Sequence, residues 1–185
     1  MNYNMIRSKV LAELEQSLSA VTQEMAEALC AELLAARKVF VIGVGRVMLM
    51  MQAFAKRLNH LGIETYFVGE INEPAITERD LLVIGSGSGE TAIPVAISQV
   101  AKRFDPQIVH IGSNMESTIS RASDIHVRIP CRTKLNRPDE IHSFQPMSTL
   151  FEQALLLFLD CICVMLIEEK RIDVPSLWQL HANLE

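Results

Sequence analysis

The sequence predicts an α/β protein in which a five-stranded parallel sheet carries helices on both faces. From Lys38 onward, short apolar runs rich in β-branched residues alternate with segments of helical periodicity. Continuous apolar runs of this length are typical of parallel strands that are buried on both faces. A chain of 185 residues, 49% of them hydrophobic, is long enough for one well-buried domain and short for two. We therefore expect a single domain over residues 1–185.

The order of the expected elements is typical of a doubly wound, flavodoxin-like αβα sandwich. The expected strands are Val39–Val44, Thr65–Val68, Leu81–Gly85, Ile108–Ile111 and Ile125–Ile129. Helices are expected at Met48–Leu61, Thr91–Lys102, Glu116–Ala122 and Thr149–Lys170. The proline-containing stretch Cys131–Met147 is expected to be a long loop, and long loops in compact domains are often functional.

The N-terminal segment predicts one long amphipathic helix at about residues 7–36. It contains no glycine or proline, and its apolar residues recur with alternating spacings of three and four. Such a helix either covers only its own domain or also packs on another subunit, and the pattern leaves both open. At the other end, a C-terminal tail is expected at about residues 174–185.

Composition excludes several classes of partner. The formal net charge is −5, aromatic residues are 5% of the chain, and no basic stripe is present, so extended nucleic-acid binding is not expected. The N-terminus lacks an apolar core followed by a cleavage site, which predicts a cytoplasmic protein. The apolar stretch Ala154–Ile167 is shorter than a bilayer span and contains Asp160, so we expect a buried helix and no membrane association.

The four cysteines predict reduced core thiols. Cys30, Cys131, Cys161 and Cys163 show no CxxC spacing and have no nearby histidine partner. A metal site or a disulfide framework is therefore not expected.

The strongest functional feature of the sequence is an expected strand followed directly by a loop of glycine and hydroxyl residues. The loop Ser86-Gly87-Ser88-Gly89-Glu90-Thr91 follows the apolar run from Leu81, and a helical segment follows the loop. Glycines let backbone N–H groups approach an anion, and serine and threonine hydroxyls and the helix N-terminus add further donors. No lysine follows the last glycine, so this is not the loop of a nucleotide hydrolase. The alternative is a plain turn in which Ser88 caps the helix.

The loop after the first strand, Gly43-Val44-Gly45-Arg46, is a second candidate for ligand binding. A dinucleotide site is weakly supported, because Met48 stands where the third glycine of that fingerprint belongs. Arg46 fits better as a fork for a phosphate or a sugar hydroxyl, and a surface ion pair with an acidic neighbour is the alternative.

These segments together resemble the sugar isomerase (SIS) domain family, and within it the 6-phospho-3-hexuloisomerase branch. The resemblance covers nearly the whole chain. The matching segments are GxGR at 43–46, AFAKRLNHLG at 53–62, VGE at 68–70, DLLVIGSGSGET at 80–91, QPMSTLFEQ at 145–153 and HANLE at 181–185. The last two are specific to that branch.

The resemblance implies a phosphosugar site and a catalytic carboxylate. It implies phosphate binding by Ser86, Ser88 and Thr91 with their glycines, Glu152 as the catalytic carboxylate, and a homotetramer whose C-terminal segments complete neighbouring sites. In the HANLE context His181 becomes a candidate acid or base, whereas alone it would be solvated surface. One departure is Val47, where the family usually has serine after GxGR; Met48 and Leu49 follow it in place of small residues.

Glu152 has a structural alternative to catalysis. Thr149-Leu150-Phe151-Glu152 fits the capping box S/T-x-x-E, in which the glutamate would bond to the backbone at the start of the helix. Among the remaining histidines, His110 and His126 lie inside expected strands and are interpreted as packing residues. His142, in the long loop, is a weaker alternative to His181.

The expected activity is an isomerase that moves a carbonyl between C3 and C2 of a hexulose 6-phosphate through a cis-enediolate. Such a reaction needs a base, donors for the developing oxyanion and a held phosphate, and it requires no metal or redox cofactor. The alternatives are a catalytically silent phosphosugar-binding module, which Val47 keeps open, and an isomerase of the same family with another sugar phosphate as its substrate.

Overall fold

A computed structural model describes residues 2–184, and its centre is the expected five-stranded parallel sheet. The strands lie in the order β2-β1-β3-β4-β5, which is the flavodoxin-like order. Their bounds are β1 Val39–Ile42, β2 Thr65–Phe67, β3 Leu81–Gly85, β4 Gln107–Gly112 and β5 Ile125–Arg128. The predicted fold class and all five predicted strands are confirmed, because short, fully apolar runs are stable only between two helical layers.

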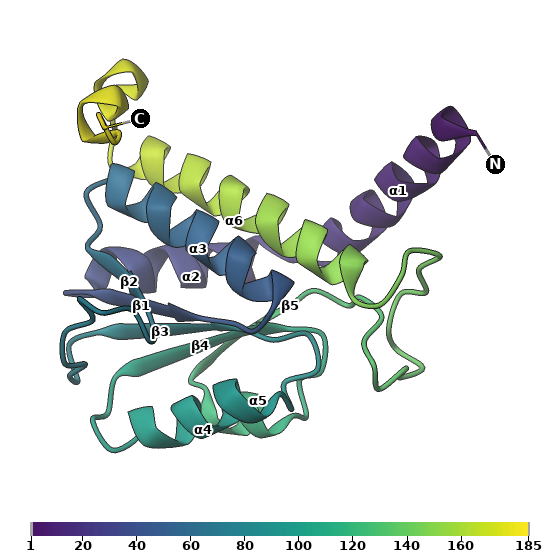
Figure 1. Ribbon diagram of the computed structural model, residues 1–185, viewed down its shortest axis with the longest axis horizontal. Helices are drawn as coiled ribbons and strands as arrows, with labels where there is room; N and C mark the ends of the chain where they lie inside the picture. The colour runs from purple at the N-terminus through teal and green to yellow at the C-terminus, as the bar shows by residue number, and fades with distance from the viewer. Residues whose placement is uncertain (1, 185) are drawn as a thin grey trace.

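Helices cover both faces of this sheet (Figure 1). One layer contains α2 (Gln23–Ala35), α3 (Arg46–His60) and α6 (Thr149–Glu169), whose buried apolar side chains form the larger core cluster. The other layer contains α4 (Ala92–Ala101) and α5 (Thr118–Ala122) over a smaller cluster. A 3₁₀ helix, η1 (Val174–Leu180), follows α6.

The single N-terminal helix predicted at 7–36 is wrong, because the segment forms two helices. The first, α1 (Tyr3–Leu18), ends at Ser19, and α2 begins after Thr22. The Thr22 hydroxyl accepts a hydrogen bond from the N–H of Met25 at 3.4 Å, and such a cap starts a new helix. Figure 1 shows α1 pointing away from the sheet, with the N-terminus at its outer end.

The longest helix, α6, packs against α3 along the larger core cluster. Its 21 residues are long and apolar enough to span a bilayer, so the length argument made from the sequence is wrong. A core helix meets the same criterion, and about half of α6 is buried in the protein. Its packing, rather than its length, identifies it as a core element.

Three of the four cysteines are buried, and Cys161 is exposed. The prediction of core thiols is therefore wrong for Cys161. Residues two apart on a helix point to different sides, so Cys163 faces the core while Cys161 faces outward. All four thiols are free. Within residues 2–184, no group of three or more histidine, cysteine or acidic side chains is placed to hold a metal ion.

Candidate active site

The principal cavity, of about 770 Å³, opens at the carboxyl ends of β1 and β3. This is the point where the strand order reverses, and open α/β sheets bind ligands there. Four parts of the chain line the cavity: Val44 and Val47 after β1, the stretch from Gly85 through the loop after β3 into α4, the segment 132–148, and the first turn of α6. The predicted site residues among its lining are Ser86, Gly87, Ser88, Thr91 and Glu152.

The carbonyl groups of the Ser86–Ser88 loop all face the protein. Each accepts a hydrogen bond from β4 or from the segment that follows it. The donors are His110 Nε2 at 2.9 Å, Ser113 N at 2.9 Å, Asn114 N at 3.2 Å and Asn114 Nδ2 at 3.3 Å. Because the carbonyl groups are held inward, the loop presents its donors to the cavity.

The backbone N–H groups of Gly87, Ser88 and Thr91 donate to no oxygen atom among the described residues 2–184. The hydroxyl groups of Ser86 and Ser88 accept hydrogen bonds from the N–H groups of Gly89 and Glu90, which tightens the loop. The helix α4 begins directly after Thr91, so its partial positive charge lies at the same place. Free N–H groups beside a helix N-terminus form an anion-binding site. The predicted Ser88 cap is wrong, because Thr91 is the N-cap residue of α4.

A buried histidine supports this loop from below. His110 Nε2 donates to the Ser86 carbonyl oxygen, which can only accept, so Nδ1 is the acceptor of the Ser120 hydroxyl at 2.8 Å. Burial lowers the pKa of His110 to about 4, because the charged ring would lose its hydration. The ring is therefore neutral near pH 7. The packing role predicted for His110 is confirmed, whereas His126 is exposed and its predicted packing role is wrong.

Two glycines of the site adopt backbone conformations that favour glycine. Gly89 has φ +63°, and a Cβ atom there would lie 2.0 Å from the Ser117 hydroxyl oxygen. Gly45 has φ +61° and lies at the N-cap position of α3, directly before Arg46. Both glycines shape the loops without lining the cavity, so they act through the backbone.

Glu152 is buried in the first turn of α6, and its carboxylate points to side chains instead of to its own helix. It accepts a hydrogen bond from Nε of Arg46, and the Ser148 hydroxyl donates to it at 3.4 Å. The capping box that was the alternative for Glu152 is not formed: Ser148 is the N-cap residue, and the N–H of Thr149 donates to the Pro146 carbonyl oxygen. The carboxylate is therefore not used by the helix end.

Arg46 forms the ion pair that the sequence allowed as an alternative, and its acidic partner is Glu152. The arginine side chain is 63% exposed and that of Glu152 is 9% exposed. Glu152 lines the cavity, whereas Arg46, although predicted to bind the ligand, is not among the lining residues. Val47, in the family's serine position, does line the cavity. The residue adds an apolar contact where a hydroxyl was expected.

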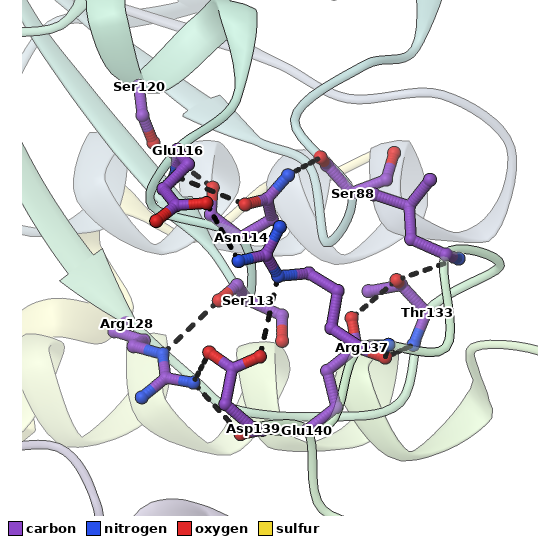
Figure 2. A network of polar contacts seen from close by, with 11 residues as sticks. Ser88, Ser113, Asn114, Glu116, Ser120, Arg128, Thr133, Arg137, Asp139 and Glu140 are labelled. Atoms are coloured by element: carbon purple, nitrogen blue, oxygen red, sulfur yellow. Dashed lines mark hydrogen bonds and ion pairs between the residues drawn. The ribbon is translucent and has the colours of Figure 1, made fainter.

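The long loop predicted at Cys131–Met147 forms much of the cavity wall and contributes two cations, Arg132 and Lys134, that were not predicted. Figure 2 shows how part of this loop is tied down. Glu140 is buried and accepts hydrogen bonds from the N–H and hydroxyl groups of Thr133 at 2.9 and 2.5 Å. Arg128 and Arg137 form ion pairs in the same network. Lys134 follows Thr133, which these hydrogen bonds within the loop hold, and Lys134 lines the cavity.

His181 lies far from Glu152 in the same chain. Its ring is 5.4 Å from that of His60, which ends α3, whereas Arg46 begins α3 beside Glu152. The 15 residues of α3 separate the two ends by about 21 Å. Figure 1 shows the C-terminal segment at the end of α3 and α6 that is remote from the 131–147 loop. His142 is exposed and does not line the cavity, and Glu185 lies outside the described residues.

Comparison with known proteins agrees with this geometry. The family model of the SIS domain matches residues 32–159, which include the sheet, the loop after β3 and Glu152. The chain belongs to the SIS domain family. The match to the SIS domain confirms the resemblance drawn from the sequence motifs.

Relatives of this SIS domain cover almost its full length. A protein from Bacillus subtilis (strain 168) named 3-hexulose-6-phosphate isomerase is 38% identical over 178 residues, or 96% of each chain. One of the same name from Mycobacterium gastri is 32% identical over 96% of this chain and 89% of its own. A crystal structure of a hypothetical protein from Methanococcus jannaschii, described as inferring a molecular function of 3-hexulose-6-phosphate isomerase, is 27% identical. It superposes with a TM-score of 0.85 and covers 98% of this chain and 99% of that one.

Proposed function

We propose that this SIS domain is an isomerase that interconverts 3-hexulose 6-phosphate and fructose 6-phosphate. The observation that carries the proposal is that the free N–H groups of the loop after β3 and the buried carboxylate of Glu152 meet in one cavity. An anion site and a carboxylate base are the two parts that proton transfer on a sugar phosphate requires. The names of the full-length relatives support this choice of substrate.

In the proposed reaction the phosphate group binds to the Ser86–Thr91 loop, which fixes the sugar chain in the cavity. Glu152 removes the proton from C2 of 3-hexulose 6-phosphate, giving a cis-enediolate across C2 and C3. Glu152, now protonated, returns the proton to C3 while the C2 hydroxyl group gives its proton to the oxygen atom on C3 and the carbonyl forms at C2, which yields fructose 6-phosphate. Arg46, beside the carboxylate, donates to the oxygen atoms on which negative charge develops.

The proposal includes a homotetramer of single-domain chains, residues 1–185, in which His181 serves a neighbouring subunit's site. The distance along α3 supports this assignment, because His181 does not reach Glu152 within one chain. Exposed apolar side chains on two helices, Leu11 on α1 and Leu157 and Val164 on α6, offer surface for such contacts. A cytoplasmic location is part of the same proposal, as expected for metabolism of sugar phosphates.

The proposal is tested by incubating the purified protein with a panel of ketose and aldose phosphates in D₂O. The expected result is turnover of 3-hexulose 6-phosphate and fructose 6-phosphate, with deuterium appearing at C2 or C3 of the product or the recovered substrate. Binding without turnover or exchange would favour the phosphosugar-binding module. Turnover of a different sugar phosphate alone would assign another substrate.

A further inference from the structure

A single glutamate on α1 holds the cavity wall that lies 130 residues away in the sequence. The Glu13 carboxylate accepts hydrogen bonds from the Ser143 hydroxyl at 2.6 Å, the Phe144 N–H at 3.0 Å and Gln145 Nε2 at 3.1 Å. Burial alone would raise the pKa of Glu13, but these three hydrogen bonds outweigh burial and lower the pKa below its ordinary value. Near pH 7 Glu13 is therefore an ionised group that only accepts.

This acceptor fixes the polarity of the Gln145 side chain. An amide has a donor end and an acceptor end, and the ionised Glu13 takes the donor end. The Gln145 Oε1 atom consequently faces away from Glu13. The main chain is held as well, because the N–H of Gln145 donates to the Ser143 hydroxyl oxygen at 3.0 Å.

The oxygen end of Gln145 is available to a ligand. The residue lines the cavity and is only 8% exposed, yet its Oε1 atom has no hydrogen-bond donor among residues 2–184. The Oε1 atom is also not one of the side-chain oxygen or nitrogen atoms that are fully buried without a partner. It is therefore accessible, and it faces the cavity rather than packed protein. A neutral acceptor with a fixed direction is thereby presented to the cavity.

The rest of the cavity supplies donors more readily than acceptors. The Ser86–Thr91 loop presents N–H groups, and Arg132 and Lys134 can only donate. The carboxylate of Glu152 is an acceptor already bonded to Arg46. A sugar chain carries several hydroxyl groups whose protons need acceptors, and leaving one unpaired in a closed site costs affinity.

We propose that Gln145 Oε1 accepts a hydrogen bond from one hydroxyl of the bound sugar phosphate, and that Glu13 is the positioning residue that orients this amide. The proposal rests on the proposed function for its ligand. It assigns to Gln145 a part in substrate selection and to α1 a part in the site, although α1 does not itself line the cavity.

The test combines variants of the protein with variants of the sugar. Fructose 6-phosphate and its 1-deoxy, 4-deoxy and 5-deoxy analogues are compared on wild type, Gln145→Met and Glu13→Gln, by kcat/KM and by calorimetric Kd. Methionine keeps the side-chain volume and removes the amide acceptor. Glu15→Gln is the matched control, because Glu15 lies on the same helix and bonds only to the Ser19 hydroxyl among the described residues.

For one of the deoxy analogues, the preference for fructose 6-phosphate over the analogue, measured as a ratio of kcat/KM or of Kd, should be roughly 3- to 10-fold larger in wild type than in Gln145→Met. This factor is the equivalent of one neutral hydrogen bond. Glu13→Gln should lose part of the same preference, with a change in KM larger than that in kcat. A glutamine at position 13 can donate as well as accept, so the Gln145 amide can then flip its oxygen and nitrogen ends. Glu15→Gln should match wild type. The preferences at the other two positions should remain.

The proposal is overturned if Gln145→Met changes kcat/KM and Kd by the same factor for all four ligands, because a uniform change indicates a structural role only. It is equally overturned if the preferences of Gln145→Met equal those of wild type. The Kd comparison needs no turnover. A wild type that binds fructose 6-phosphate but does not isomerise it therefore refutes the proposed function and still decides the role of Gln145.

Discussion

At the scale of single residues, two buried titratable side chains have separate tasks at opposite sides of the phosphate loop. Glu152 is buried with its carboxylate facing Arg46, and its own helix end does not use it. His110 lies beneath the loop, where it donates to the Ser86 carbonyl oxygen. The first group is the base of the proposed reaction, and the second holds the loop proposed to bind the phosphate.

Replacing Glu152 with glutamine should abolish most of the isomerase activity. Glutamine cannot accept the proton from carbon, so kcat should fall by at least about 10²-fold, in line with general-base contributions. The melting temperature should change little, because the carboxylate does not cap α6. Activity and deuterium exchange in D₂O measure the effect, with Glu168→Gln, exposed at the far end of α6, as the control. Normal turnover with continued exchange would move the base to His181 or His142.

His110 should make the protein less stable in mild acid. Its pKa of about 4 lies below the ordinary value of 6.5, so between these pH values the unfolded chain binds a proton that the folded chain does not. The free energy of unfolding should therefore fall by about 2 kcal/mol from pH 7 to pH 5 on account of this group. Urea titrations at both pH values measure it. His110→Gln should be less stable than wild type at pH 7, but its free energy of unfolding should fall less than that of wild type between pH 7 and pH 5.

The matched control is His142→Gln, which changes an exposed histidine. Its stability should depend on pH as that of wild type does. An equal loss in His110→Gln and wild type would show that other groups cause the acid sensitivity.

At the scale of elements, the strand-loop-helix unit of β3 and α4 carries the backbone donors of the proposed phosphate site. The inward carbonyl groups are held by β4 and the segment after it, and the outward N–H groups have no partner within residues 2–184. The hydroxyl groups of Ser86 and Ser88 accept hydrogen bonds that tighten the loop. Each hydroxyl accepts in these bonds, so its own proton remains available for donation to a phosphate oxygen.

The double change Ser86→Ala with Ser88→Ala should weaken hexose 6-phosphate binding at least about tenfold. Each hydrogen bond to a charged group contributes roughly 1.5–3 kcal/mol, and the remaining N–H groups keep part of the affinity. Calorimetric titration measures the change, and Ser123→Ala serves as the control because its hydroxyl bonds only to the Ile119 carbonyl oxygen among residues 2–184. An unchanged affinity would limit the two hydroxyl groups to shaping the loop.

At the scale of the whole molecule, the two ends of the chain lie at opposite sides of the α3–α6 layer. The C-terminal segment with His181 packs near the end of α3, and α1 projects on the side where the 131–147 loop lies (Figure 1). An assembly of several copies is the way in which His181 would come to a cavity of this kind.

The protein should therefore run well above its monomer mass of 20.7 kDa in light scattering. Removing residues 181–185 should reduce turnover by roughly 10²-fold or more, as for loss of an acid-base group. The melting temperature should fall little, because residues 182–184 are exposed and His181 is only half-buried. Mixing the truncated chain with Glu152→Gln chains should restore part of the activity if sites are shared. A fully active truncated protein, or an active monomer, would reject the shared site.

Much of the fold followed from local patterns in the sequence. The five strands are short apolar runs, and their alternation with helices leaves few arrangements other than a parallel sheet between two layers. The phosphate loop could be placed for the same reason, since a glycine and serine loop between a strand and a helix is a local feature. The family, confirmed by the SIS match, was recognisable from motifs of this kind.

What the sequence by itself determined was the fold class, the five-stranded sheet and the family. Only the tertiary structure decided which polar groups meet: Glu152 with Arg46 in place of a capping box, and Glu13 with the wall at 143–145. Local periodicity also concealed the break before Thr22 and the outward face of Cys161. The physical reason is that such contacts join residues more than a hundred positions apart, and their partners are selected by packing across the core rather than by neighbours along the chain.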